Sequence, residues 1–122
     1  MQADTLLSGG TVITMNADRL VIENGAIAVS GDKIVAIGRA AELAEQVEAA
    51  EVIDCTGHVV FPGLVDVHAH AGHGLIKTMG VHGGDRWEAI CGEVYTQISP
   101  PDFWRAEARL AAFERLRFGV TT

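Results

Sequence analysis

Basic residues, cysteine and long apolar runs are all scarce in this chain of 122 residues. Nine Lys and Arg stand against sixteen Asp and Glu, so a net charge of -7 makes nucleic acid an unfavourable partner. Cys55 and Cys91 lie far apart, which favours free thiols in a reduced compartment. Charged residues or glycine interrupt every apolar run, and the N-terminus lacks the pattern of an export signal. These absences predict a cytoplasmic protein without a membrane or nucleic-acid partner.

The first part of the chain is rich in short β-like runs that turn-forming residues separate. The stretch AIAVSGDKIVAIG, residues 26–38, joins two runs of Ile, Val and Ala through Ser-Gly-Asp, which predicts a β-hairpin. Asn24-Gly25 predicts a further turn before it. We therefore expect a small antiparallel sheet in this region.

A helix and two more strands are predicted after the hairpin. Residues 39–50 consist mainly of helix formers, with Leu43 and Val47 four positions apart on one face. The stretches EVID and HVVF lie on either side of Cys55-Thr56-Gly57 and predict two strands around a tight turn. A short surface helix should therefore lie between strands.

The pattern changes at Pro62. Residues 63–67, GLVDV, form a compact apolar run of the kind found in a strand buried on both sides. Residues 71–98 are rich in glycine and lack a sustained period, which predicts a long loop with one helical turn near Trp87 to Ile90. Loops of this length in compact domains are usually functional.

The clearest helix is predicted over residues 99–119, SPPDFWRAEARLAAFERLRFG. Ser99 can cap its start, Asp102 suits the positive end of the helix dipole, and Gly119 can end it. Its apolar residues recur at helical spacing and predict one buried face: Phe103, Ala106, Leu110, Phe113 and Leu116. Residues 119–122, GVTT, predict the start of another strand. One strand-helix-strand unit cannot close on itself, so we expect the rest as further sequence or as a companion chain.

Two histidines follow the apolar run. In an extended strand Asp66, His68 and His70 share one side, while Val65 and Val67 share the other. Two imidazoles on one side can converge on a single metal ion, and the apolar side can pack against helices. An isolated H-x-H motif is more often a pair of solvated loop residues. Here the apolar run before the motif and the glycine-rich loop after it favour a metal site.

The motif FPGLVDVHAH, residues 61–70, resembles the first-barrel-strand signature of the metal-dependent amidohydrolase superfamily. GAIAVSGDKIVAIG and VIDCTGHVVFPG resemble the N-terminal part of the β-sandwich that accompanies the barrel in that superfamily. GLIKTMG and the helix ending in GVTT are similar to its chlorohydrolase, guanine deaminase and cytosine deaminase branch. The resemblance implies an α/β fold that is incomplete on its own. Residues 1–60 would form part of an antiparallel β-sandwich. Residues 61–122 would form the first strand, loop and helix of a (β/α)8 barrel of the TIM type, ending at the start of the second strand.

The same resemblance implies that His68 and His70 bind a catalytic divalent metal, Zn²⁺ or alternatively Fe²⁺. The whole enzyme would hydrolyse carbon-nitrogen bonds other than peptide bonds, by hydrolytic deamination of a nitrogen heterocycle through a metal-activated water. Two alternatives stay open: a cyclic amide or urea hydrolase of the hydantoinase-dihydroorotase type, and a small non-catalytic subunit that completes the barrel of a larger partner. Two imidazoles fall short of the three protein ligands usual for catalytic zinc, so this chain alone should be inactive. Its other expected partners are a small-molecule substrate and further copies in an oligomer.

Three more residues are candidates for substrate binding. Relatives often carry Met or another residue at the position of His73, and Arg at the position of Lys77. The wall of the substrate pocket therefore differs at these two positions. Trp87 lies in the predicted long loop and can reach the pocket. Asp66 is expected to accept structural hydrogen bonds, and His82 is expected to be an ordinary loop residue.

Overall fold

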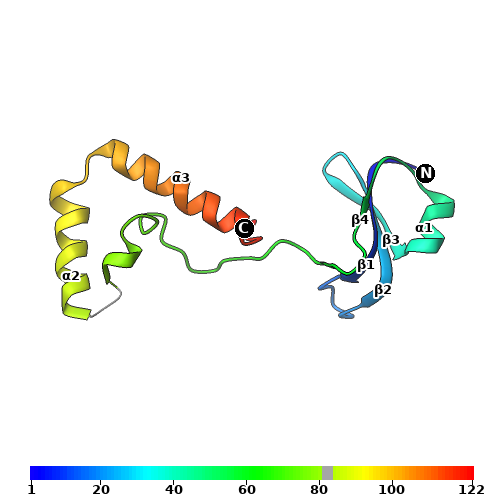
Figure 1. Cartoon of the computed structure of the whole chain (residues 1–122), viewed down its shortest axis with the longest axis horizontal. Coiled ribbons are helices and arrows are strands. Elements are labelled where there is room, and N and C mark those ends of the chain that lie inside the picture. Colours follow the sequence, from blue (N-terminus) through cyan, green and yellow to red (C-terminus); the bar gives the residue numbers. More distant parts are fainter. Residues whose placement is uncertain (81–83) are drawn as a thin grey trace. The chain divides into compact units, whose positions relative to one another are not determined.

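The computed structural model describes residues 1–80 and 84–122, which form two compact units, Met1–Pro62 and Gly63–Thr122. His82 lies outside the described residues. Figure 1 shows the strands in the first unit and the long helices in the second. Within residues 1–80 and 84–122, no helix combines the length and the apolar character that a membrane crossing requires.

A five-stranded mixed sheet builds the first unit (Figure 1). Its strands are β1 (Gln2–Ile13), β2 (Val21–Ser30), β3 (Lys33–Arg39), β4 (Glu48–Asp54) and β5 (Val59–Val60). The order is β3-β2-β1-β4, and β5 also pairs with β1. The pairs β1-β2 and β2-β3 are antiparallel, as predicted. β4 and β5 are both parallel to β1, a pairing that the local sequence pattern does not indicate.

Turn chemistry explains one prediction in this sheet and corrects another. The hairpin between β2 and β3 is confirmed, with Gly31 at a positive φ of 58° and its N–H donating to the Asp4 carboxylate over 2.6 Å. The turn expected at Asn24-Gly25 is wrong, because both residues lie within β2. Asn24 takes a φ of 48° there, and the register with β1 shifts beside it, so the pair forms a bulge.

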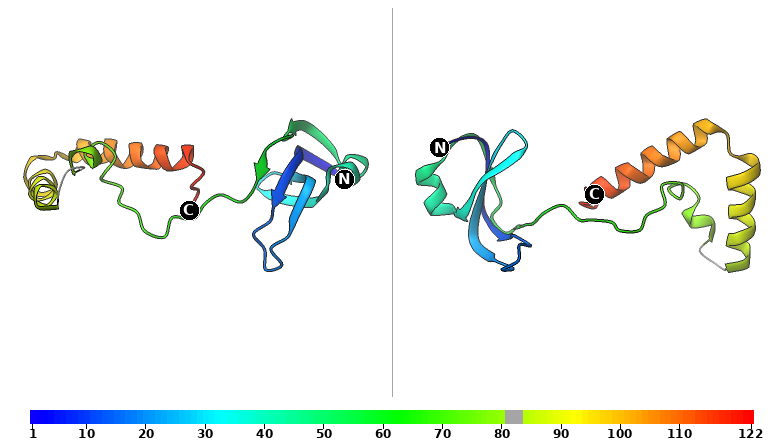
Figure 2. Two further views of the ribbon diagram at one scale, coloured as in Figure 1. Left: turned by 60° about the horizontal axis from the view of Figure 1, so that its bottom comes forward. Right: turned by 180° about the vertical axis from the view of Figure 1, so that it is seen from behind.

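The core of the first unit lies between the sheet and helix α1 (Ala40–Gln46). Its buried residues are Ala3, Leu6, Ala26, Ala28 and Leu43. Val47 packs against this cluster, so the predicted inward face of the helix is confirmed. The helix is shorter than residues 39–50 because Val47 is already extended and β4 begins at Glu48. Figure 2 shows α1 beside the strands from two further sides.

The second unit is mainly helical. It contains a 3-10 turn η1 (Lys77–Gly80), helix α2 (Gly84–Glu93), a π-helical turn η2 (Val94–Ile98) and helix α3 (Pro101–Arg117). The long loop predicted over residues 71–98 is therefore wrong in its second half. The glycines at positions 84 and 92 conceal α2 in the sequence, although the seven residues between them contain no helix breaker.

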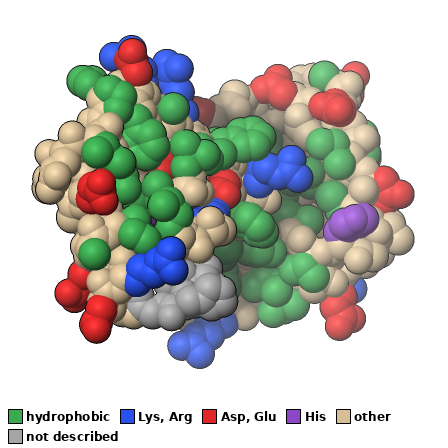
Figure 3. Space-filling model, turned by 60° about the vertical axis from the view of Figure 1, so that its left-hand side comes forward, with side chains coloured by type: hydrophobic (Ala, Val, Ile, Leu, Met, Phe, Trp, Pro, Cys, Tyr) green, Lys and Arg blue, Asp and Glu red, His purple; other side chains and the backbone are tan. Residues whose placement is uncertain are grey.

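Helix α3 has the predicted extent but different ends and a different buried face. Pro100 occupies the N-cap position instead of Ser99, and no side chain caps the helix. Gly119 follows it with φ at 77°, which confirms the predicted stop. Phe113 is 58% exposed and Leu116 is 64% exposed, so the described residues of the second unit do not bury this end of the predicted apolar face. Phe103 and Leu110, on the same face, are half-buried. Figure 3 shows hydrophobic side chains at many places on the face that it views.

Residues 63–67 do not form the expected buried strand, and Val67 is 93% exposed. Leu64 nevertheless makes a parallel bridge to Val120. The Leu64 N–H donates to the Gly119 carbonyl over 2.7 Å, and the Thr121 N–H donates to the Leu64 carbonyl over 2.9 Å. Two parallel segments with a helix between them are the beginning of a β-α-β arrangement. An apolar segment with one short neighbour stays open to solvent on its other sides.

Candidate metal centre

The two histidines of the H-x-H motif converge. The Nε2 atoms of His68 and His70 lie 3.1 Å apart, and their ring centroids are separated by 5.1 Å. Two nitrogens bound to one tetrahedral zinc, each at 2.0–2.1 Å, would lie about 3.3 Å apart. The spacing and the chemistry of these donors therefore fit two ligands of one zinc ion. Both side chains are exposed, so the described residues of the second unit do not enclose them in the dry interior that we expected.

Asp66 holds the backbone from which these ligands project. Its carboxylate accepts a hydrogen bond from the His68 backbone N–H over 3.1 Å and another from Arg115 Nε over 3.2 Å. The His68 N–H, followed by the Arg115 guanidinium, holds the pKa of Asp66 below its ordinary value. Asp66 therefore accepts the structural hydrogen bonds that its position suggested.

His73 adjoins the pair. Its ring is stacked on His70, with the centroids 4.8 Å apart and the planes within 5° of parallel. Trp87 meets His73 edge-on at 5.3 Å, and Tyr95 lies 5.6 Å from it. Trp104 is stacked on Tyr95 at 5.0 Å. The structure thus gathers His73 and Trp87, two of the candidate substrate residues, in one aromatic cluster beside His70.

Lys77 has a different environment. Its Nζ donates to both carboxylate oxygens of Glu114, over 2.6 and 2.7 Å. This ion pair joins η1 to α3 and occupies the ammonium group that was a candidate for substrate binding. Lys77 still lines a hollow with His70 and His73, so it lies beside the cluster while pairing elsewhere.

Two hollows border His70 within the second unit. One, of about 340 Å³, is lined by polar residues that include Asp66, His73, Lys77, Glu114 and Arg115. The other, of about 420 Å³, is lined by Gly72, His73, Tyr95, Trp104 and Ala108. His70 thus separates a charged hollow from an aromatic one.

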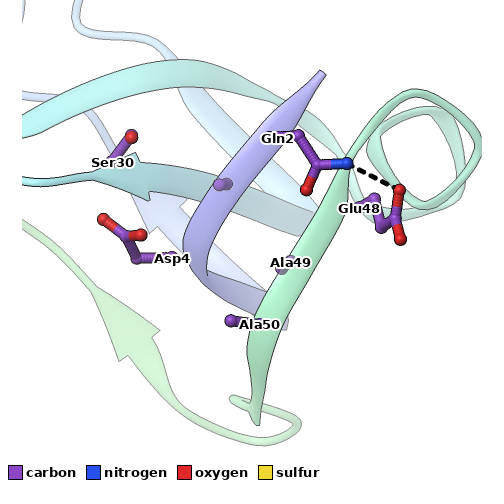
Figure 4. A pocket seen from close by; sticks show the side chains of 7 residues that line it. Gln2, Asp4, Ser30, Glu48, Ala49 and Ala50 are labelled. Atoms are coloured by element: carbon purple, nitrogen blue, oxygen red, sulfur yellow. Dashed lines mark hydrogen bonds between the residues drawn. The ribbon is translucent and has the colours of Figure 1, made fainter.

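A further hollow, of about 280 Å³, lies in the first unit, where β1 runs beside β4 (Figure 4). Gln2 Nε2 donates to Glu48 Oε2 there over 2.7 Å (Figure 4). This hydrogen bond joins the beginnings of the two strands and satisfies polar groups at the rim. We therefore assign these residues a structural role.

No cluster of three or more His, Cys, Asp or Glu suited to a metal ion occurs within residues 1–80 and 84–122. The part of the chain that the structure describes therefore offers two histidine ligands and no third.

Comparison with known proteins finds one family model and several relatives that the chain resembles over part of its length. A family model described as the imidazolonepropionase-like composite domain of bacteria matches residues 25–46, which run from β2 to the end of α1. The 5-methylthioadenosine/S-adenosylhomocysteine deaminase of Bacillus anthracis is 42% identical over 76 residues, 62% of this chain and 17% of the relative. Deaminase 1 of Syntrophus aciditrophicus, of the same description, is 38% identical over 68 residues, 56% of this chain and 15% of the relative.

Two solved structures are also similar to the chain. An adenosine deaminase from Xanthomonas campestris with bound zinc is 28% identical, with a TM-score of 0.86 over 98% of this chain and 28% of that one. Over residues 25–46 the chain is similar to an N-terminal composite domain of the amidohydrolase superfamily. Atrazine chlorohydrolase from Arthrobacter aurescens, complexed with zinc, is also 28% identical, with a TM-score of 0.73 over 96% of this chain and 27% of that one.

These amidohydrolase relatives are much longer than the chain. It spans 15–17% of the deaminases and 27–28% of the two solved structures. The relatives and structural neighbours are hydrolases and deaminases, and the two solved structures contain zinc.

Glu107 is a residue that sequence reasoning missed. Its side chain is 0% exposed, and both carboxylate oxygens accept the Leu75 N–H over 2.9 Å. Burial raises the pKa of nearby Tyr95, with smaller contributions from Cys91 and Glu107. A signal was available, because Glu107 lies on the same face of the predicted helix as Phe103 and Leu110. A charged residue among apolar residues on one helix face indicates that it has a hydrogen-bond partner in the interior.

Proposed function

We propose that this chain is the N-terminal part of a metal-dependent amidohydrolase that deaminates a nitrogen heterocycle. His68 and His70 would supply two ligands of a divalent metal, zinc before iron. The observation that carries the proposal is the 3.1 Å approach of the two Nε2 atoms. The zinc in two structural neighbours and the deaminase names of the relatives support it.

The fold proposed for the whole protein is a (β/α)8 barrel beside a β-sandwich. Residues 1–60 would belong to the sandwich, and residues 61–122 would supply the first strand and helix of the barrel. The parallel bridge between Leu64 and Val120, on either side of α3, supports the barrel part. Further sequence or a companion chain would supply the remaining strands, in a cytoplasmic oligomer.

The residues of this chain would have distinct tasks at the site. His68 and His70 would hold the metal, which when bound lowers the pKa of a coordinated water toward neutrality. Asp66 would keep the ligand backbone in place through its hydrogen bond to the His68 N–H. His73 and Trp87 would form one wall against a flat heterocycle, since their rings already lie in contact beside His70. Lys77 would support this wall through Glu114.

Zinc titration of the whole 122-residue chain tests the ligand assignment. Competition against a chromophoric chelator should show that His68→Ala and His70→Ala each weaken Zn²⁺ binding by at least about tenfold, a loss that even outer-shell substitutions reach. His58→Ala is the matched control, because this exposed imidazole lies in the first unit. Equal binding by the wild type and both ligand variants would contradict the proposal. A repeat with Fe²⁺ under anaerobic conditions compares the two metals.

Activity of the isolated chain tests the two-ligand account. The chain alone should release no ammonia from 5-methylthioadenosine above background, because two imidazoles do not complete a catalytic zinc site. Zinc-dependent release of ammonia by the purified chain would show that this account is wrong.

A further inference from the structure

Glu107 is a buried carboxylate to which the proposed function assigns no task. It lies in the middle of α3 with none of its surface exposed. A buried carboxylate is unfavourable unless hydrogen bonds replace its water. Here both oxygens accept the same donor, the backbone N–H of Leu75. The helix therefore uses a buried charge to hold one amide of the segment that follows the H-x-H motif.

That segment lies directly on α3. A Cβ added at Gly74 would approach Glu107 Oε2 to 2.7 Å and Leu110 Cδ2 to 3.1 Å. With a larger residue at position 74, the Glu107 carboxylate or the Leu110 side chain would have to shift. Leu75 itself is 54% exposed, whereas the next residue, Ile76, is 5% exposed.

Aromatic residues hold the start of the same segment. A Cβ added at Gly72 would approach Trp104 Cζ3 to 2.6 Å, and the Tyr95 hydroxyl donates to the Gly72 carbonyl over 3.4 Å. Gly72 and Gly74 are thus both packed closely against other side chains, and His73 lies between them. The ring of His73 is stacked on His70 there.

We propose that Glu107 is a positioning residue for the metal ligand His70. By holding the Leu75 N–H it fixes the backbone around His73, and the stacked His73 ring keeps His70 turned toward His68. This inference rests on the proposed metal site, because positioning His70 matters only if His70 binds a metal. The contacts that link Glu107, His73 and His70 can be tested without metal.

The first test measures geometry in the metal-free chain. Glu107→Leu removes the acceptor but leaves an apolar side chain of similar size in a buried place, so α3 should still form. We expect loss of the nuclear Overhauser contact between the rings of His70 and His73, and at least about tenfold faster hydrogen exchange at the Leu75 amide. Glu107→Gln keeps one acceptor oxygen and should retain the ring contact. Asp102→Asn, which removes an exposed charge from the same helix, is the control and should change neither quantity.

Loss of the ring contact while the α3 amides remain protected supports a positioning role. If the α3 amides lose protection in Glu107→Leu, that variant no longer tests the ring contact, because the helix itself has opened. Glu107→Gln then decides the question, because it keeps an acceptor oxygen and the size of the side chain. The proposal requires that Glu107→Gln retain the contact between the two histidine rings. A ring contact that persists in Glu107→Leu overturns the proposal, as does its absence from the wild type.

The second test measures zinc affinity. Glu107→Leu and His73→Ala should each weaken Zn²⁺ binding by about tenfold, the lower end of outer-shell effects. His73→Phe keeps a flat ring against His70 and should bind zinc within about twofold of wild type, because the stacking ring remains. If His68→Ala and His70→Ala lose zinc while Glu107→Leu and His73→Ala do not, the positioning role fails and the metal site stands. If the wild type binds no zinc, the metal site fails, and the ring contact still decides the positioning role.

Discussion

Leu43→Ala tests whether α1 and the sheet share one core. Leu43 is 5% exposed and lies in a cluster with Ala3, Leu6, Ala26 and Ala28. Three of these neighbours are alanines on sheet strands, whose short side chains cannot move into the space that leucine leaves. The cavity should therefore persist, and we expect a loss of about 3 kcal/mol in the free energy of unfolding, within the range known for buried leucines.

The assay follows the first unit by itself. Urea and thermal unfolding can be monitored through amide NMR signals of β1 and β2. A loss of about 3 kcal/mol corresponds to a fall in Tm of about 12–24 °C for a unit of this size. Fluorescence of the two tryptophans follows the second unit separately, because Trp87 and Trp104 both lie there.

Leu20→Ala is the matched control for this prediction. Leu20 is 48% exposed and lies outside the core cluster, so its removal should cost less than about 1 kcal/mol. Equal losses in Leu43→Ala and Leu20→Ala would refute the argument, since they would mean that α1 does not bury its leucine against the sheet.

Three further predictions concern the second unit. The folded-state pKa of Asp66 is lowered, so its contribution to stability is present above its unfolded pKa of about 3.9 and is lost as the pH falls through the folded value. NMR titration should show that Arg115→Ala raises the pKa of Asp66 only partway, because the larger cause is a backbone N–H; an unchanged value would contradict this. A double-mutant cycle of Lys77→Ala and Glu114→Ala should give a coupling of about 0.2–1 kcal/mol for a half-exposed pair, and a coupling of zero would mean that the pair forms no effective ion pair in solution. Gly119→Ala should destabilise the end of α3 by about 1 kcal/mol because φ is positive there, and unchanged amide exchange in the last turn would argue against that conformation.

Local signals predicted the elements that depend on neighbouring residues. The hairpin over residues 26–38 follows from a glycine that can adopt positive φ between two β-branched runs. Helix α3 follows from seventeen residues without a helix breaker after its first turn. The Nε2 atoms of His68 and His70 lie 3.1 Å apart, although residues 65–70 do not form the strand from which their convergence was predicted. Their role as metal ligands stays a prediction.

The failures share one cause, which is dependence on distant parts of the chain. The Asn24-Gly25 pair reads as a turn, and only its pairing with β1 makes it a bulge. The apolar residues of α3 predict a buried face, but burial requires a partner surface, and the described residues of the second unit supply none for Phe113 and Leu116. The same holds for Val67.

The sequence by itself determined the H-x-H motif, the amphipathic helix and the resemblance to amidohydrolases, because residue type and spacing along the chain carry that information. Tertiary structure alone decided that β4 runs parallel to β1, that His73 stacks on His70, and that Glu107 is buried against the Leu75 amide. Two of these contacts join residues that are far apart along the chain, so their spacing in the sequence gives no information about their distance in space. His70 and His73 are the exception, because they are close neighbours in the sequence. Even there, only the structure shows that Gly72 and Gly74, on either side of His73, pack against side chains that are distant in the sequence.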